Sequence, residues 1–210
     1  MLEPAPEESL MSQAVALGLR AHSGWAAAVA VAGSPMKPII LERRRIETAD
    51  GRIAGSKQPY HAAKGLSTEA AEALIRQCRE SSTLLAIQAL NTLATQVGKH
   101  GLTLVGVAIL VASGRPLPTL AAILRSHALI HTAEGEFFRE VLVAASQHCS
   151  LEVTRIKERG IWETGARVFG LPIAALQQRI GHLGNSVGLP WRQDEKFASL
   201  AAWIASFGSK

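Results

Sequence analysis

The chain has 210 residues, of which 48% are hydrophobic, 19% charged and 5% aromatic, and 22 Lys and Arg against 17 Asp and Glu give a net charge of +5. A chain of this length and apolar content can bury a substantial core, which excludes an intrinsically disordered protein. The two cysteines, Cys78 and Cys149, cannot make a disulfide scaffold and favour a reducing cytoplasm. The longest apolar stretches, residues 25–33 and 102–113, are shorter than the roughly 20 residues that a membrane-spanning helix needs, so a cytoplasmic protein with no membrane partner is expected.

The first part of the chain favours antiparallel strands. Residues 14–20 and 25–33 are extended apolar runs, and Gly24 in the link between them suits a tight hairpin turn. Residues 37–47 alternate more clearly and carry charges on both parities, which indicates a third strand near the sheet edge. Residues 48–66 contain three glycines and a proline, so they predict a loop.

A long helix and a buried strand are expected next. Ser67 or Thr68 can cap a helix that runs towards Gly98. Residues 102–112 are apolar on both parities, which is typical of a central, buried strand of a parallel sheet. Helical sequence in two segments then continues to about His148.

The last third of the chain predicts a strand and three helices. Residues 151–156 are rich in β-branched side chains and indicate a short strand. Residues 161–169 and 174–183 have helical patterns. Residues 194–207 predict a closing helix whose buried stripe contains Leu200, Trp203, Ile204 and Phe207.

These elements indicate one α/β domain over residues 14–207, preceded by a flexible leader at 1–13 that is acidic and contains prolines. Residues 126–135 (SHALIHTAEG) combine small side chains with a glycine, residues 151–156 (LEVTRI) supply the next strand, and the closing helix begins DEKFASLAAWIA at Asp194. In this order of elements the chain resembles the ribonuclease H-like superfamily, most closely its Holliday-junction resolvase branch. The resemblance implies a mixed five-stranded sheet, with three antiparallel strands followed by parallel strands, flanked by helices.

The resemblance also implies a place for metals that this sequence does not match. Nucleases of the superfamily hold two divalent metals between carboxylates from the first strand, the central strand and the last helix, because two neighbouring dications need several anionic ligands. Residues 14–20 and 102–112 contain no acid. Asp194 matches the first aspartate of the last helix, but Phe197 stands in place of the second. Two-metal cleavage is therefore not expected.

Basic groups in the corresponding crevice indicate an anion site instead. Strand ends and adjacent turns are where ligands dock in open α/β sheets. Four residues are expected to bind the anion: Arg20, Ser23, Ser113 and Arg115. The alternative left open is a structural ion pair between Arg20 and one of three carboxylates: Glu134, Glu136 or Asp194.

A second candidate site is a set of metal ligands on one predicted helix. His127, His131 and Glu134 are spaced i, i+4 and i+7, so a continuous helix places them on one face, where two histidines and a carboxylate can bind zinc. His61 could join them in space. The alternative is that these histidines are ordinary packed or capping residues.

An arginine run at residues 42–47 is the other basic feature. Arg44 falls on one face of the predicted edge strand and Arg43 and Arg45 on the other. Arginine rows can follow phosphates, and the alternative is a charged edge that protects the sheet.

Three functions remain open from the sequence. The leading hypothesis is a ribonuclease H-like pseudo-enzyme that binds nucleic acid or a phosphorylated ligand at the basic crevice. The second is a hydrolase with a rebuilt site around a single divalent metal, using His22, Asp194 and Glu134 as catalytic residues. The third is a homodimer that buries the small-residue helix face at 128–135.

Overall fold

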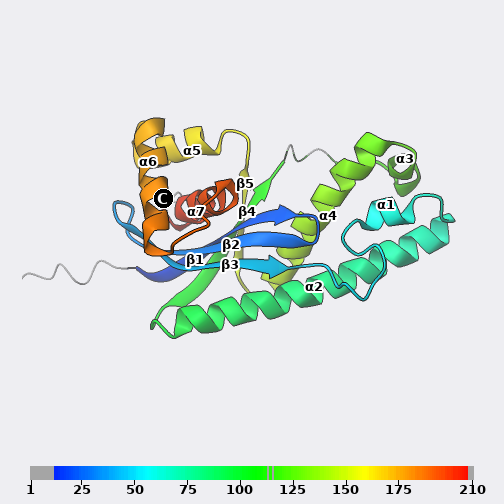
Figure 1. Cartoon of the computed structure of the whole chain (residues 1–210), viewed down its shortest axis with the longest axis horizontal. Coiled ribbons are helices and arrows are strands. Elements are labelled where there is room, and N and C mark those ends of the chain that lie inside the picture. The colour runs from blue at the N-terminus through cyan, green and yellow to red at the C-terminus, as the bar shows by residue number, and fades with distance from the viewer. Residues whose placement is uncertain (1–11, 113, 115, 208–210) are drawn as a thin grey trace, which may run out of the picture.

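A five-stranded sheet of order β3-β2-β1-β4-β5 organises the chain (Figure 1). The structure is a computed structural model that describes residues 12–112, 114 and 116–207. The strands are β1 (Ser12–His22), β2 (Trp25–Gly33), β3 (Pro38–Glu47), β4 (Thr103–Val111) and β5 (Glu152–Lys157). The helices are α1 (Pro59–Ala63), α2 (Thr68–Gly98), α3 (Leu120–Leu124), α4 (His127–His148), α5 (Ile161–Phe169), α6 (Ile173–Leu183) and α7 (Gln193–Phe207), with a short 3₁₀ helix at Gly184–Ser186.

The strand pairing is that of the expected mixed sheet. β1, β2 and β3 pair antiparallel, whereas β4 lies parallel to both β1 and β5. The predicted fold class is therefore confirmed. Two details differ: β1 and not β4 is the middle strand, and β4 is buried without interruption only over residues 107–110. In its first half Leu104 is buried but Val105 is 47% exposed, because only one side of the strand is covered there.

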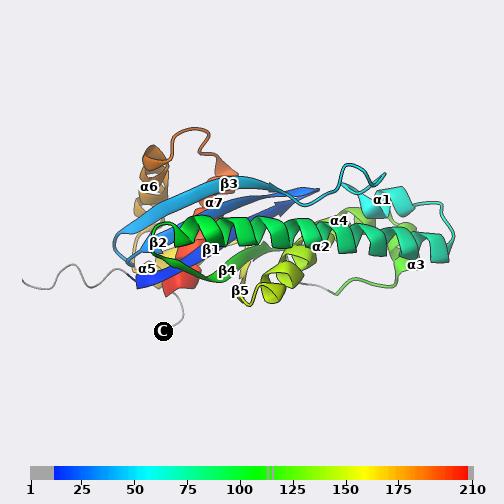
Figure 2. The ribbon, with the colours of Figure 1, turned by 90° about the horizontal axis from the view of Figure 1, so that it is seen from below.

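Helices cover both faces of the sheet and make two cores. α2 and α4 pack on one face, and Figure 2 shows α2 running along the sheet. α7 lies on the other face with α5 and α6 outside it. The N-terminal ends of α2 and α4 extend beyond the strands, and α1 and α3 lie beside them (Figures 1 and 2). In the described part of the chain, no helix has the length and apolar character needed to cross a membrane.

Close packing of α7 on β1 determines where the first turn of α7 lies. Gly18 of β1 faces the helix, and a Cβ at this position would lie 1.8 Å from the carbonyl oxygen of Ala198. Of the predicted buried stripe of α7, Leu200 and Trp203 are fully buried, and Ile204 is 7% exposed. This packing brings the start of α7 to the carboxyl end of β1.

Two predicted boundaries differ from the structure. β1 begins at Ser12, inside the predicted leader, and residues 1–11 lie outside the described residues. The predicted loop at 48–66 contains the short helix α1, which has Pro59 in its first turn. The carboxylate of Glu134 in α4 accepts hydrogen bonds from the first backbone N–H groups of α1, a long-range contact that local composition does not reveal.

Candidate functional site

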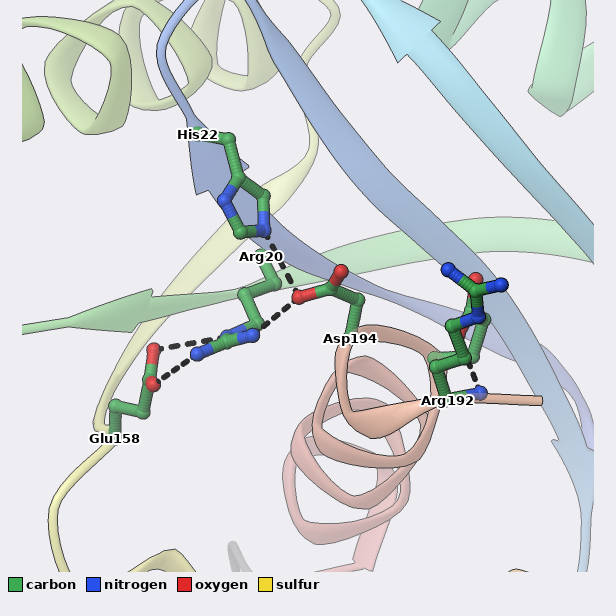
Figure 3. Close-up of polar contacts among 6 residues, drawn as sticks. Arg20, His22, Glu158, Arg192 and Asp194 are labelled. Atoms are coloured by element: carbon green, nitrogen blue, oxygen red, sulfur yellow. Dashed lines mark hydrogen bonds and ion pairs between the residues drawn. The ribbon is translucent and has the colours of Figure 1, made fainter. Parts of the chain in front are cut away.

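An arginine lies between two carboxylates at the carboxyl ends of β1 and β5 (Figure 3). Arg20, near the end of β1, donates from Nε and Nη2 to Glu158 at 3.2 and 2.5 Å, and from Nη1 to Asp194. Glu158 directly follows β5, and Asp194 lies in the first turn of α7. One guanidinium therefore joins the ends of three elements.

The charges of this group stabilise one another. The hydrogen bond to Glu158 raises the pKa of Arg20 despite its partial burial, and Asp194 adds to the effect. Burial disfavours the ionised form of Asp194, but the hydrogen bonds and charges of Arg20 and His22 outweigh burial and hold the pKa of Asp194 below its usual value. An incoming anion therefore has to compete with the carboxylates of Glu158 and Asp194 for Arg20.

His22 continues this network along the edge of the sheet. Its Nε2 lies 2.9 Å from Asp194 Oδ1, and its ring stacks on Trp25 with a centroid separation of 4.2 Å. On the other side, the guanidinium carbon of Arg45 lies 4.0 Å from the centre of the Trp25 ring. A half-exposed run of contacts thus leads from Asp194 through His22 and Trp25 to Arg45.

Of the other predicted anion ligands, the structure describes Ser23 alone. Ser23 is exposed in the turn between β1 and β2, and its hydroxyl makes no hydrogen bond within the described residues. Ser113 and Arg115 lie outside the described residues. The ion pair between Arg20 and Asp194 is one of the structural pairings that the sequence left open, whereas Glu158 was missed. Its position immediately after a parallel strand was the available signal.

The residues at the strand ends do not fit a pair of divalent metals. Asp194 and Glu158 both bind Arg20, and neither β1 nor β4 supplies an acid. Phe197, in place of a second aspartate on α7, has its ring centre 5.3 Å from the guanidinium carbon of Arg20. The cationic centre of this region is thus a guanidinium, and the two described carboxylates at these strand ends, Glu158 and Asp194, are both its partners and do not make an anionic set for two dications.

Three histidines form a separate group at the N-terminal end of α4. His127 and His131 lie one turn apart, with their Nε2 atoms 3.0 Å from each other, and His61 of α1 faces both. One ring nitrogen from each histidine can be chosen so that all three lie within 4.8 Å of one another. The histidine that the sequence suggested as a spatial partner is therefore the third member of the group.

Glu134 lies behind these histidines and not among them. Its Oε1 accepts from the backbone N–H groups of Tyr60 and His61 at 2.9 and 3.0 Å and lies 3.2 Å from His61 Nδ1. Burial raises the pKa of Glu134, although its hydrogen bonds to His61 and Tyr60 oppose this shift. Of the three predicted catalytic residues, His22 and Asp194 are in contact, whereas Glu134 belongs to the histidine group.

Comparison with known proteins identifies the fold. No family model matches the sequence, and no curated protein is similar to it in sequence. Two structures of RuvC from Thermus thermophilus, each 10% identical, are similar in three dimensions. One, in complex with a Holliday junction substrate, has a TM-score of 0.50 and covers 92% of both chains. The other has a TM-score of 0.52 and covers 93% of this chain and 97% of RuvC. At this identity the likeness shows the fold alone, which confirms the expected ribonuclease H-like architecture.

Proposed function

From a ribonuclease H-like fold with an arginine among its strand-end carboxylates, we propose that the chain binds nucleic acid and does not cleave it through two divalent metals. The observation that carries this proposal is the position of Arg20 between Glu158 and Asp194. The guanidinium engages both carboxylates and offsets the negative charge that two metals would need from them, while the positive charge for nucleic acid comes from neighbouring arginines.

The face of the sheet that carries α7 supports binding to a polyanion. Arg20 and Arg45 both pair with Ala27, so these three residues point to the same face, and Arg43 shares this face through its pairing with Val29. Arg43 hydrogen bonds only to backbone carbonyls within the described residues, so its charge is not neutralised. Two arginines of β3 and one of β1 therefore lie on the face of the sheet that carries α7, where they can contact the phosphates of one polyanion.

Arg45 of this group and Arg192 beside it can both offer their charge to a phosphate. Arg45 forms an ion pair with Glu47 at 2.6 Å, but both side chains are more than half exposed, and such surface pairs exchange readily for a phosphate. Figure 3 shows the Arg192 guanidinium apart from the Arg20 network, and it has no hydrogen-bond partner in the part of the chain that the structure describes. RuvC of the same fold has a structure with a Holliday junction substrate, which makes a branched DNA the first ligand to test.

The test is a fluorescence-anisotropy titration with a four-way DNA junction, a duplex and a single strand of equal length. Binding at low salt is expected, and the combined Arg43→Ala, Arg45→Ala and Arg192→Ala variant should bind more weakly. The slope of log affinity against log salt should fall by about 1 for each phosphate that the variant no longer neutralises.

Arg155→Ala is the matched control. Arg155 is also a strand arginine in an exposed ion pair, with Glu140 at 2.6 Å, but it lies on the α4 side of the sheet. It should bind as the wild type does. Absence of binding to all three DNAs at low salt, or an equal loss in the control, would contradict the proposal. If a free mononucleotide at low concentration displaced the DNA, the ligand would be a phosphorylated small molecule and not nucleic acid.

A further inference from the structure

We propose that His61, His127 and His131 bind one transition-metal dication of the zinc class. The site lies on α1 and α4 beyond the end of the sheet and is independent of the Arg20 network, so the two proposals stand or fall separately (Figure 1).

The spacing of the His127 and His131 ring nitrogens is close to that of tetrahedral coordination. Two nitrogens bound to zinc at about 2.0–2.1 Å with tetrahedral angles lie roughly 3.3 Å apart. The Nε2 atoms of His127 and His131 are 3.0 Å apart. One cation can therefore contact both nitrogens from the same side of the helix.

His61 is held in a metal-binding orientation by a buried carboxylate. Glu134 Oε1 lies 3.2 Å from His61 Nδ1, which favours the tautomer with hydrogen on Nδ1 and leaves the Nε2 lone pair free. The ring of His61 lies with its centroid 4.8 Å from that of His131 and 5.7 Å from that of His127. Carboxylate–histidine–metal arrangements of this kind fix the ring and make it a better ligand.

Glu134 itself has features of a group built to support a cation. Its side chain is 4% exposed, and its Oε2 has no hydrogen-bond partner among the described residues. A buried carboxylate without a full set of donors is costly unless positive charge lies nearby. A metal held by His61 supplies that charge through the imidazole ring.

The donor set also indicates the class of metal. Three imidazole nitrogens suit Zn²⁺, Co²⁺, Ni²⁺ or Cu²⁺, whereas Mg²⁺ and Ca²⁺ prefer oxygen ligands. His127 and His131 are exposed, so the fourth coordination position is open to water or to an external ligand. Three protein ligands with an open fourth position are the arrangement of catalytic and not of structural zinc sites.

The test is calorimetric titration of Zn²⁺ into chelator-treated, untagged full-length protein, followed by the absorption spectrum with Co²⁺. One equivalent of metal and the intense visible bands of tetrahedral Co²⁺ are expected. The variants His61→Ala, His127→Ala and His131→Ala should each weaken binding by roughly 100-fold or more, beyond what removal of an outer-shell partner costs. Glu134→Gln should weaken it by roughly 10-fold with the tetrahedral spectrum retained, as expected of a positioning residue.

His148→Ala is the control, because His148 lies on the same helix but outside the group. It should bind Zn²⁺ as the wild type does. Circular dichroism of each variant verifies folding, which the exposed positions of His127 and His131 should preserve. Binding that survives in all three histidine variants, or a folded protein that takes up no metal at micromolar Zn²⁺, would overturn the proposal.

Discussion

The guanidinium of Arg20 donates a hydrogen bond to the carboxylate of Asp194, which joins the carboxyl end of β1 to the first turn of α7. The same guanidinium holds Glu158 after β5. The resemblance to ribonuclease H-like nucleases implies metal ions beside carboxylates at these strand ends. Here the cation beside the carboxylates is the side chain of Arg20.

Arg20→Ala should lower the free energy of unfolding by about 2–4 kcal/mol, because it leaves Glu158 and Asp194 partly buried without their shared partner. Urea denaturation at pH 7 measures the change. Arg155→Ala removes an exposed ion pair and should cost less than about 1 kcal/mol. Equal effects of the two variants would mean that the Arg20 network adds no stability of its own.

Asp194→Asn should destabilise the protein at neutral pH, by about 1–3 kcal/mol, and less at low pH. The pKa of Asp194 is lowered in the folded state, so its stabilising contribution is complete above the ordinary aspartate pKa of about 4 and is lost as the pH falls through the lowered value. Urea titrations at a series of pH values should therefore show the wild-type and Asp194→Asn curves converging below about pH 4. A constant difference down to pH 2 would contradict the lowered pKa.

Glu134→Ala should cost about 1–3 kcal/mol, because it leaves the backbone N–H groups of Tyr60 and His61 without an acceptor. In Glu134→Gln the side-chain oxygen can still accept from both groups, and no charge has to be buried, so the metal-free protein should be at least as stable as the wild type at pH 7. Thermal unfolding compares the two variants. Equal losses would show that the charge of Glu134, and not its acceptor, holds α1.

Gly18→Ala should destabilise the protein by about 1–3 kcal/mol or more, because the added Cβ would overlap the Ala198 carbonyl and force α7 away from β1. Gly181→Ala is the matched control. A Cβ at Gly181 meets nothing within 4 Å, and alanine favours the helix by about 0.5–1 kcal/mol. If Gly18→Ala were as well tolerated as Gly181→Ala, the close packing that positions Asp194 would be wrong.

The elements that the sequence predicted are those with a local signal. Residues 25–33, for example, were expected as a strand with the bounds that β2 has, because an apolar run between two glycine turns has few alternatives. α1 was missed, because its first N–H groups are satisfied by Glu134, which lies more than 70 residues away. Its start was hidden in a segment rich in glycine.

The candidate sites show the same division. The absence of acids from β1 and β4 could be read directly, and so could the i, i+4 spacing of His127 and His131. The direction in which the Glu134 side chain points could not be predicted. Its i+7 spacing places it on a helical face but does not say which part of that face meets the core. Glu158 reaches Arg20 only through the parallel order of β1, β4 and β5.

The central claim, binding without two-metal cleavage, is tested most directly by incubating a labelled four-way DNA junction with the protein in Mg²⁺ or Mn²⁺ and separating the products on a denaturing gel. Protein concentrations should be high enough to bind all of the junction. We expect a bound and intact junction, since Arg20 occupies the carboxylates that two metals would need. Metal-dependent cleavage that Asp194→Asn abolishes would contradict this claim.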